Sequence, residues 1–294
     1  MLSSHNFWPD ANFAALSAEL SAFETAQFVV IPVPYDATTS WRGGTREGPQ
    51  AIIEASMNME TFDRELKREI CECGIHTTRF VEPVAKSPES MAVRVTEVVG
   101  EVLFADKIPI LLGGEHSLSF GGVCAALKLD LQGPLSVLQL DAHTDLRASY
   151  GGSRFSHACV ARRVSELPGV QITQVGLRAT SAEEHADIPA NVTQFWCEDV
   201  LGDWDAAIEQ IVDSLSDDVY LTFDVDVCDP TWIPNTGTPE PGGLGYYQVR
   251  DLLREVCRRK NVVALDCVEL MGGHPASAFA VARLLYKCMG YLSE

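Results

Sequence analysis

The sequence of 294 residues has few basic side chains and no long apolar run. Lys and Arg number 22 against 41 Asp and Glu, which gives a formal net charge of −19. Nucleic-acid binding needs a basic patch, and no Lys/Arg cluster is longer than the three residues at 258–260. No apolar stretch approaches the roughly 18 residues of a membrane span, and residues 1–10 lack the pattern of a secretion signal. We therefore expect a cytoplasmic protein without a nucleic-acid or membrane partner.

A disulfide framework is also missing. The nine cysteines are odd in number and dispersed, and Cys71 and Cys73 form a C-x-C pair without a second pair at zinc spacing. Most of the cysteines lie in apolar runs, where a free thiol packs as a small hydrophobic group. We therefore expect nine reduced, structural cysteines.

The excess of acidic residues has two interpretations. The negative field could concentrate a small cationic molecule, or the charge could only keep the protein in solution. Apolar residues make up 46% of the chain, which is typical of a folded globular protein.

Short apolar runs alternate with segments of helical periodicity along the chain. The Val-, Ile- and Leu-rich runs predict strands buried on both faces of a sheet, at residues 28–33, 108–113, 135–141, 172–176, 219–225 and 262–268. Helices are predicted at residues 49–59, 90–104, 123–127, 158–164, 204–215, 248–258 and 276–289. This alternation is typical of an α/β fold with a mostly parallel sheet and right-handed crossovers. No linker divides the sequence, so we expect a single domain over residues 1–294.

Two long loops, residues 34–49 and 230–245, are rich in Gly and Pro and follow predicted strands. Ligand sites in α/β sheets lie where strands pass into loops at their carboxyl ends. Loops of this length are more often functional than ordinary connections. The two loops are therefore expected to border a site.

Three motifs place chemically active side chains at the ends of predicted strands. In the run LQLDAHTDLR, Asp141, His143 and Asp145 recur at every second position. An extended backbone would direct these three side chains to one side, successive ones roughly 6.6 Å apart. The run LTFDVDVCDP repeats the pattern with Asp224 and Asp226, and His116 follows a strand through a Gly-Gly turn. We call these six residues the predicted ligand set: His116, Asp141, His143, Asp145, Asp224 and Asp226.

Each motif alone has an ordinary structural explanation. A D-x-D sequence can cap a turn or helix, and a histidine after Gly-Gly can be a hydrogen-bonded turn residue. Together, however, four carboxylates and two imidazoles at neighbouring strand ends would repel one another unless cations paired with them. Six ligands exceed the four of a structural zinc site and suit two metal ions roughly 3.5–4 Å apart. Oxygen-rich coordination favours a hard ion such as manganese.

These motifs resemble the ureohydrolases, the family that includes arginase and agmatinase. The shared motifs span most of the chain: GGEHS around His116, DAHTD at 141–145, SHACVARR around His157, FDVDVCDP at 223–230, TGTPEPGG at 236–243 and LDCVEL around Glu269. The resemblance implies a three-layer αβα fold and a centre with two Mn²⁺ ions. It also implies hydrolysis of a guanidino group to an amine and urea, and assembly into a homo-oligomer, a trimer or hexamer.

The resemblance also implies a role for each site residue. The first metal ion would be held by His116, Asp141, Asp145 and Asp224, and the second by Asp141, His143, Asp224 and Asp226. Asp141 and Asp224 would then bridge the two ions. Glu269 would pair with the guanidinium of the substrate, and His157 would carry a proton to the departing amine. Without the resemblance, Glu269 is a solvated acid after a strand and His157 a histidine at a helix start.

Four histidines, His5, His76, His185 and His274, lack metal spacing and are expected to be structural or exposed.

Within the family, the sequence is more similar to agmatinase than to arginase. The Asn that arginases use to hold a substrate carboxylate is missing at Arg147, which favours agmatine, cleaved to putrescine and urea. Ala158 after His157 and the run LMGGHPASAF after Glu269 depart from the pattern of many relatives, and the second departure leaves the substrate open. Arg147 and Arg154 could pair with the carboxylate of guanidinobutyrate or guanidinopropionate.

Other substrates and classes stay open as alternatives. Aminopropylagmatine and arginine are alternative guanidino substrates. A metal-dependent amide deacetylase and a non-catalytic metal-binding relative are alternatives from other functional classes.

Overall fold

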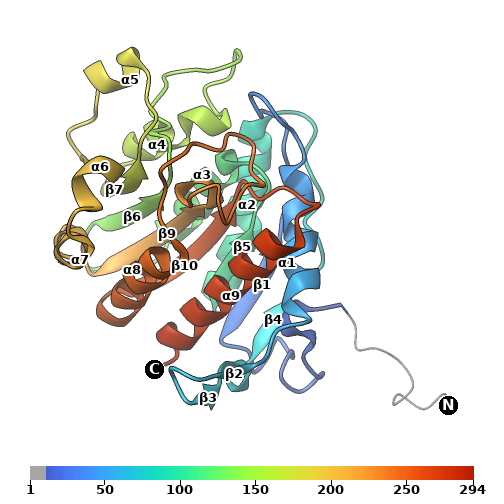
Figure 1. Ribbon diagram of the computed structural model, residues 1–294. Helices are drawn as coiled ribbons and strands as arrows, with labels where there is room; N and C mark the ends of the chain where they lie inside the picture. The colour runs from blue at the N-terminus through green and yellow to red at the C-terminus, as the bar shows by residue number, and fades with distance from the viewer. Residues whose placement is uncertain (1–10) are drawn as a thin grey trace.

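The structure, a computed structural model, describes residues 11–294 and is built around one eight-stranded sheet (Figure 1). The strand order is β4-β1-β5-β10-β9-β6-β7-β8, and every neighbouring pair is parallel. The strands are β1 (Phe28–Pro32), β4 (Ile75–Thr77), β5 (Ile108–Leu112), β6 (Leu135–Leu140), β7 (Val170–Leu177), β8 (Val192–Trp196), β9 (Asp218–Asp224) and β10 (Asn261–Val268).

Helices cover both faces of this sheet. Helices α1 (Gly48–Ser56), α8 (Tyr246–Arg259) and α9 (Pro275–Leu292) lie on the near face in Figure 1, and α2 (Pro88–Phe104), α3 (Ser119–Ala126) and α4 (Val160–Ser165) lie on the far face. Helix α7 (Trp204–Asp213) packs into the same core as α8 and α9. The predicted three-layer αβα fold is confirmed.

Alternation along β1 shows how the sequence builds these layers. Phe28 and Val30 belong to the core cluster of α1, α8 and α9, whereas Val29 and Ile31 pack with α2. Successive side chains of a strand point to opposite faces, so a continuous apolar run can bury itself against two helical layers at once.

The six predicted strands are all present, and every predicted helix overlaps a helix of the structure. The prediction missed the short elements: the edge strands β4 and β8, the hairpin of β2 (Phe62–Asp63) and β3 (Arg68–Glu69), and the helices α5 (Ala182–Ala186) and α6 (Cys197–Val200). Strand β8 is only partly buried, so it lacks the apolar run that identifies the central strands.

All nine cysteines are free thiols and most are buried, as predicted. Within residues 11–294, no helix combines the length and apolar character that crossing a membrane requires. The extent of a single domain over the whole chain stays a prediction.

Candidate active site

The carboxyl ends of four adjacent central strands carry most of the predicted site residues. Along the order β5-β10-β9-β6, His116 follows β5 and Glu269 follows β10. Strand β9 ends at Asp224, with Asp226 two residues later, and the run 141–145 follows β6. Because the strands are parallel, all four ends lie at one edge of the sheet. Residues more than 150 positions apart in the sequence are thereby brought together.

The first group of the predicted ligand set surrounds His116. Its Nδ1 lies 3.1 Å from an Asp141 oxygen, 3.1 Å from an Asp224 oxygen and 3.3 Å from an Asp145 oxygen. This buried nitrogen has no hydrogen-bond partner. The other ring nitrogen, Nε2, lies 2.9 Å from the Thr222 hydroxyl, which fixes the orientation of the ring.

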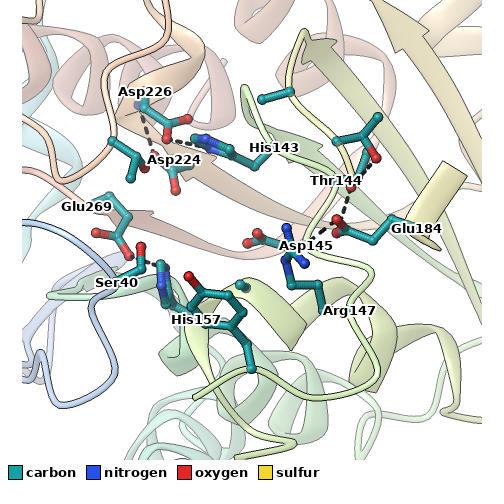
Figure 2. A pocket seen from close by; sticks show the side chains of 15 residues that line it. Ser40, His143, Thr144, Asp145, Arg147, His157, Glu184, Asp224, Asp226 and Glu269 are labelled. Atoms are coloured by element: carbon teal, nitrogen blue, oxygen red, sulfur yellow. Dashed lines mark hydrogen bonds and ion pairs between the residues drawn. The ribbon is translucent and has the colours of Figure 1, made fainter. Parts of the chain in front are cut away.

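The second group shares Asp141 with the first. His143 Nδ1 lies 2.9 Å from Asp226 Oδ2 (Figure 2). The same nitrogen lies 3.6 Å from Asp141 Oδ1. Backbone amides orient both carboxylates, since the Ala142 amide donates to Asp226 and the His143 amide donates to Asp141. In each group, three donor atoms lie within 4.8 Å of one another, close enough to hold a metal ion.

Asp145 reaches the site by a route that the sequence did not predict. Strand β6 ends at Leu140 and Asp145 has a positive φ of 49°, so the backbone is not extended through residues 141–145. The loop is instead held by Glu184, whose Oε1 accepts hydrogen bonds from the Thr144 hydroxyl and the Leu146 amide, each at 2.9 Å. Glu184 is itself fixed by a capping box with Ser181 at the start of α5.

The electrostatics of this cluster call for cations. Burial and the charges of Asp226 and Asp141 raise the pKa of Asp224 well above its usual range. Burial and the charge of Asp141 raise the pKa of Asp145 to about 7. Crowded, buried carboxylates cost free energy unless a cation pairs with them. A donor set of carboxylate oxygens and imidazole nitrogens, with an unpartnered His116 nitrogen aimed into it, fits hard divalent ions such as Mn²⁺.

Glu269 occupies a constrained position beside the cluster. Its backbone is left-handed, with φ 64°, and its amide donates to the Gly114 carbonyl at 2.7 Å. Its Oε1 accepts a hydrogen bond of 2.8 Å from the His116 amide. Burial raises the pKa of Glu269 to about 8. A left-handed, non-glycine residue at a pocket wall is typical of functional sites, where surrounding contacts hold a strained backbone.

The Gly-Gly turn before His116 has no room for a Cβ at either position. A Cβ on Gly114 would lie 1.9 Å from the Tyr35 carbonyl oxygen, and one on Gly113 would lie 2.6 Å from Val268 Cγ1. Any larger residue would push the turn away from the ends of β1 and β10. The two glycines therefore let residues 113–116 sit between these strands and contact Glu269.

His157 begins the 3-10 helix η6 (His157–Cys159) and lies across the cavity from His143 and Asp226 (Figure 2). Its Nδ1 lies 3.7 Å from Glu269 Oε1, and its buried Nε2 has no hydrogen-bond partner. Burial and the positive charges of His116 and His143 lower the pKa of His157 to about 4. The imidazole is therefore neutral near pH 7, with a ring nitrogen available to a ligand.

A cavity of about 220 Å³ lies here and is lined by His143, Asp145, Asp224, Asp226, His157 and Glu269 among others. Both long loops border it, through Ser40 of residues 34–49 and Thr238 of residues 230–245, as predicted. His116 and Asp141 are buried beneath the wall. Residues that the sequence did not single out also line the cavity: Ser40, Thr144, Tyr150, Ala179, Thr180, Glu184 and Thr238.

The two arginines considered for this site have different positions. Arg147 lines the cavity, with its Nε 3.6 Å from Glu184 Oε2 and its guanidinium 5.2 Å from the Tyr150 ring centre. Arg154 is not among the lining residues and lies 3.5 Å from Glu166. Of the two arginines, only Arg147 lines the cavity.

The remaining histidines lie away from this cavity in the part of the chain that the structure describes. His76 Nδ1 lies 2.9 Å from the Ser21 carbonyl, and His274 caps the start of α9. His185 lies in α5 and is exposed, whereas His5 lies outside the described residues.

Comparison with known proteins agrees with this geometry. The sequence profile of the arginase family matches residues 26–290. An N(1)-aminopropylagmatine ureohydrolase of Synechocystis sp. is 37% identical to this chain, over 95% of this chain and 93% of its own length. An agmatinase of Pyrococcus horikoshii is 36% identical, over 90% of this chain and 92% of its own. The crystal structure of an agmatine ureohydrolase of Thermoplasma volcanium superposes with a TM-score of 0.87 at 32% identity, covering 98% of this chain and 96% of that one.

Proposed function

Because the chain belongs to the arginase family of hydrolases, we propose that it uses two Mn²⁺ ions to cleave a guanidino group into an amine and urea. The substrate proposed is agmatine, and the products are putrescine and urea. The observation that carries the proposal is the buried His116 Nδ1, which has no hydrogen-bond partner and faces three carboxylates.

The predicted ligand set would hold the two ions. The first ion would be held by His116, Asp141, Asp145 and Asp224, and the second by Asp141, His143, Asp224 and Asp226. The shared use of Asp141 is supported by its distances to both histidines. When bound, two such ions lower the pKa of water and stabilise the negative charge that develops during hydrolysis.

Glu269 would bind and orient the guanidinium. Its Oε1 is already held by the His116 amide, so the carboxylate cannot rotate freely. A planar cation forms strong, charge-assisted hydrogen bonds with a carboxylate. Its positive charge would also compensate the burial that raises the pKa of Glu269 to about 8. The guanidinium carbon would thereby be presented to the floor of the cavity in a fixed orientation.

His157 would move the proton that the departing amine requires. Its Nε2 is buried and unpartnered, and its Nδ1 is 3.7 Å from Glu269 Oε1. Since its imidazole is neutral, Nε2 can take up a proton and pass it to the amine nitrogen as the C–N bond breaks.

The charge of the cavity supports a cationic substrate. Its lining includes five carboxylates, Asp145, Glu184, Asp224, Asp226 and Glu269, and one arginine, Arg147, which lies next to Glu184. Agmatine carries a guanidinium and a distal ammonium, and both are attracted to such a wall. Aminopropylagmatine is the second candidate, because it is named in the Synechocystis relative and presents the same guanidino group.

A urea-release assay on manganese-loaded protein tests the proposal, with agmatine, aminopropylagmatine, arginine, guanidinobutyrate and guanidinopropionate in parallel. We expect agmatine to give the highest kcat/KM. Arginine outperforming agmatine would overturn the substrate assignment. Release of acetate from an acetylated amine, without urea from any compound, would favour the deacetylase alternative. Manganese binding without either reaction would favour a non-catalytic relative.

We further propose a cytoplasmic homo-oligomer, a trimer or hexamer, as the family resemblance implies. Size-exclusion chromatography with light scattering tests the assembly, and a monomer of 32.1 kDa would contradict it.

A further inference from the structure

Glu115, next to His116, has a carboxylate that none of the roles above uses. The residue is fully buried and does not line the cavity. Its carboxylate accepts hydrogen bonds from the Thr38 amide at 2.5 Å, the Thr38 hydroxyl at 2.7 Å and the Ser117 hydroxyl at 2.6 Å. Two of the three donors belong to one residue of the loop 34–49, so Glu115 fixes Thr38 in both position and rotamer.

A further hydrogen bond links Thr38 to His157. The Thr38 hydroxyl donates its proton to Glu115, so its lone pairs are free to accept, and the His157 amide donates to it at 3.0 Å. The contact meets the first residue of η6, which also carries the imidazole. Rotation of Thr38 would therefore displace the backbone on which the imidazole depends.

The neighbouring residue aligns Glu269. The His116 amide donates to Glu269 Oε1, and the Glu269 amide donates to Gly114. Two successive residues of one turn, Glu115 and His116, are thus bonded to the two sides of the cavity wall. This turn therefore helps to position both His157 Nδ1 and Glu269 Oε1, which lie 3.7 Å apart.

The loop does not need Thr38 to close on itself. Asp36 accepts a hydrogen bond of 2.8 Å from the Gly44 amide and forms an ion pair with Arg46, which ties the loop across its base. The Thr38 hydroxyl is a separate link, directed out of the loop toward η6. Its removal should leave the loop folded.

From these contacts we infer that Thr38, held by Glu115, is a positioning residue that sets His157 at its working distance from Glu269. The inference rests on the proposed function, in which His157 moves a proton. A misplacement of about 1 Å in such a group costs roughly 100-fold in rate. The effect falls on kcat rather than KM, because Glu269 is held by the His116 amide and not by Thr38.

The test compares Thr38→Val, which keeps the shape and removes the hydroxyl, with Thr38→Ser, which restores it. Thr193→Val, at an exposed position of β8, controls for the substitution itself. Steady-state urea release, bound manganese and deuterium exchange at the His157 amide are measured for each variant and the wild type.

In Thr38→Val we expect kcat to fall roughly 10- to 100-fold, with KM and manganese content unchanged and faster exchange at the His157 amide. Thr38→Ser should recover most of the activity, and Thr193→Val should match the wild type. An unchanged kcat, unchanged exchange, or loss of manganese together with activity in Thr38→Val would overturn the inference.

The exchange measurement separates this inference from the proposed function. If the wild type releases no urea from any guanidino compound, the proposed function fails. Faster exchange in Thr38→Val would then still support the link between Thr38 and His157, and unchanged exchange would overturn it.

Discussion

Two clusters of acidic side chains in this protein have opposite electrostatics. At the active-site edge, Asp141, Asp145, Asp224 and Asp226 lie together with only imidazoles beside them. We call the other cluster, where the β2–β3 hairpin meets α9, the hairpin cluster. There Lys287 Nζ lies 2.9 Å from Asp63 and 2.7 Å from Glu65, and the Tyr291 hydroxyl donates to Glu65 at 2.9 Å.

One carboxyl group from each cluster, Glu65 and Asp145, has a pKa that moves in the opposite direction to the other. In the hairpin cluster, burial raises the pKa of Glu65, but the hydrogen bonds from Lys287 and Tyr291 outweigh it and lower the value to about 2. At the active-site edge, burial and the Asp141 charge raise the pKa of Asp145 to about 7. Lysine and arginine side chains lie beside the carboxylates of the hairpin cluster, whereas only the imidazoles of His116 and His143 lie beside those at the active-site edge. The carboxylates at the active-site edge are therefore the ones expected to bind metal cations from solution.

The largest expected effect follows removal of a shared carboxylate. Asp224→Asn should lose bound manganese and urea release together, by on the order of 10³-fold or more in kcat/KM, since both ions' charge stabilisation is removed. Metal analysis and the urea assay measure this directly. Glu65→Gln, the matched change in the hairpin cluster, should retain both. Full activity of Asp224→Asn would remove the distinction between the clusters.

Glu269→Ala should separate metal binding from turnover. Because Glu269 is outside the predicted ligand set, we expect both manganese ions to remain while kcat/KM falls roughly 10²- to 10³-fold, as for loss of one partner of a buried charge pair. Metal content and urea release are measured on the same preparation. A fully active variant would show that another group anchors the guanidinium.

Binding of manganese should stabilise the folded protein through the carboxylates at the active-site edge and not through the hairpin cluster. At a free concentration about 100 times Kd, binding contributes about 2.7 kcal/mol, or a rise in Tm of roughly 4 °C for a chain of this size. Calorimetry of metal-free and loaded protein measures the shift. Asp224→Asn should show little shift, whereas an equal shift in that variant would place the ions elsewhere.

The smallest effect is expected on the free energy of unfolding at acidic pH. Since the folded pKa of Glu65 lies below its usual value of 4.5, this residue contributes stability above pH 4.5 that is lost as the pH falls toward about 2. Solvent screens this partly exposed group, so the contribution is about 1 kcal/mol or less. Urea denaturation of metal-free wild type and Glu65→Gln across pH 2–5 measures it, and Glu65→Gln should flatten the curve. Identical curves would show that Lys287 contributes nothing through Glu65.

The central strands were predictable because a strand buried on both faces must be apolar at nearly every position. The edge strands were not, since β4 has three residues and β8 is partly exposed. The sequence likewise predicted the cluster of His116 with the aspartates, because strand ends of a parallel sheet meet at one edge.

The sequence could not predict hydrogen bonds between segments that are far apart in the chain. Glu184 holds the loop of Asp145, and Glu115 holds Thr38, through hydrogen bonds between segments 38 to 77 residues apart. The local pattern of apolar and polar residues does not predict such hydrogen-bonded pairs. The positive φ of Asp145 was hidden for the same reason, because Glu184 and not the local sequence stabilises that turn.

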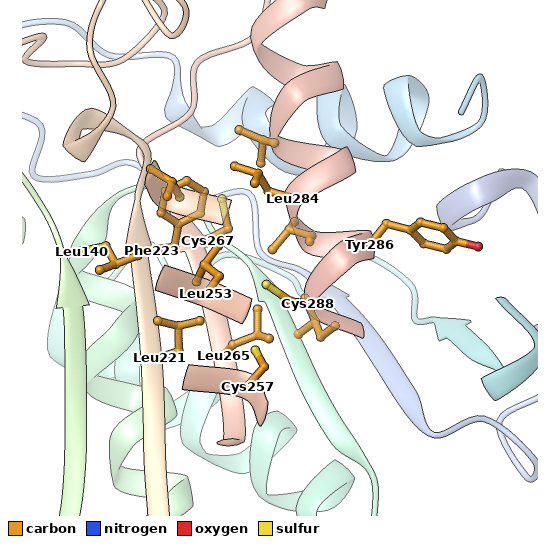
Figure 3. Packing of buried hydrophobic residues seen from close by; sticks show 14 of the residues in the cluster. Leu140, Leu221, Phe223, Leu253, Cys257, Leu265, Cys267, Leu284, Tyr286 and Cys288 are labelled. Atoms are coloured by element: carbon orange, nitrogen blue, oxygen red, sulfur yellow. The ribbon is translucent and has the colours of Figure 1, made fainter. Parts of the chain in front are cut away.

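The position of β10 has a consequence for protein synthesis. This strand is the last in the chain, yet it pairs with β5 on one side and β9 on the other, and its Leu265 and Cys267 are buried with residues of α8 and α9 (Figure 3). A nascent chain that ends before residue 261 leaves two half-sheets unjoined, with His116 on one and the aspartates on the other. Without β10, therefore, no common sheet holds His116 at the same edge as the aspartates of the predicted ligand set.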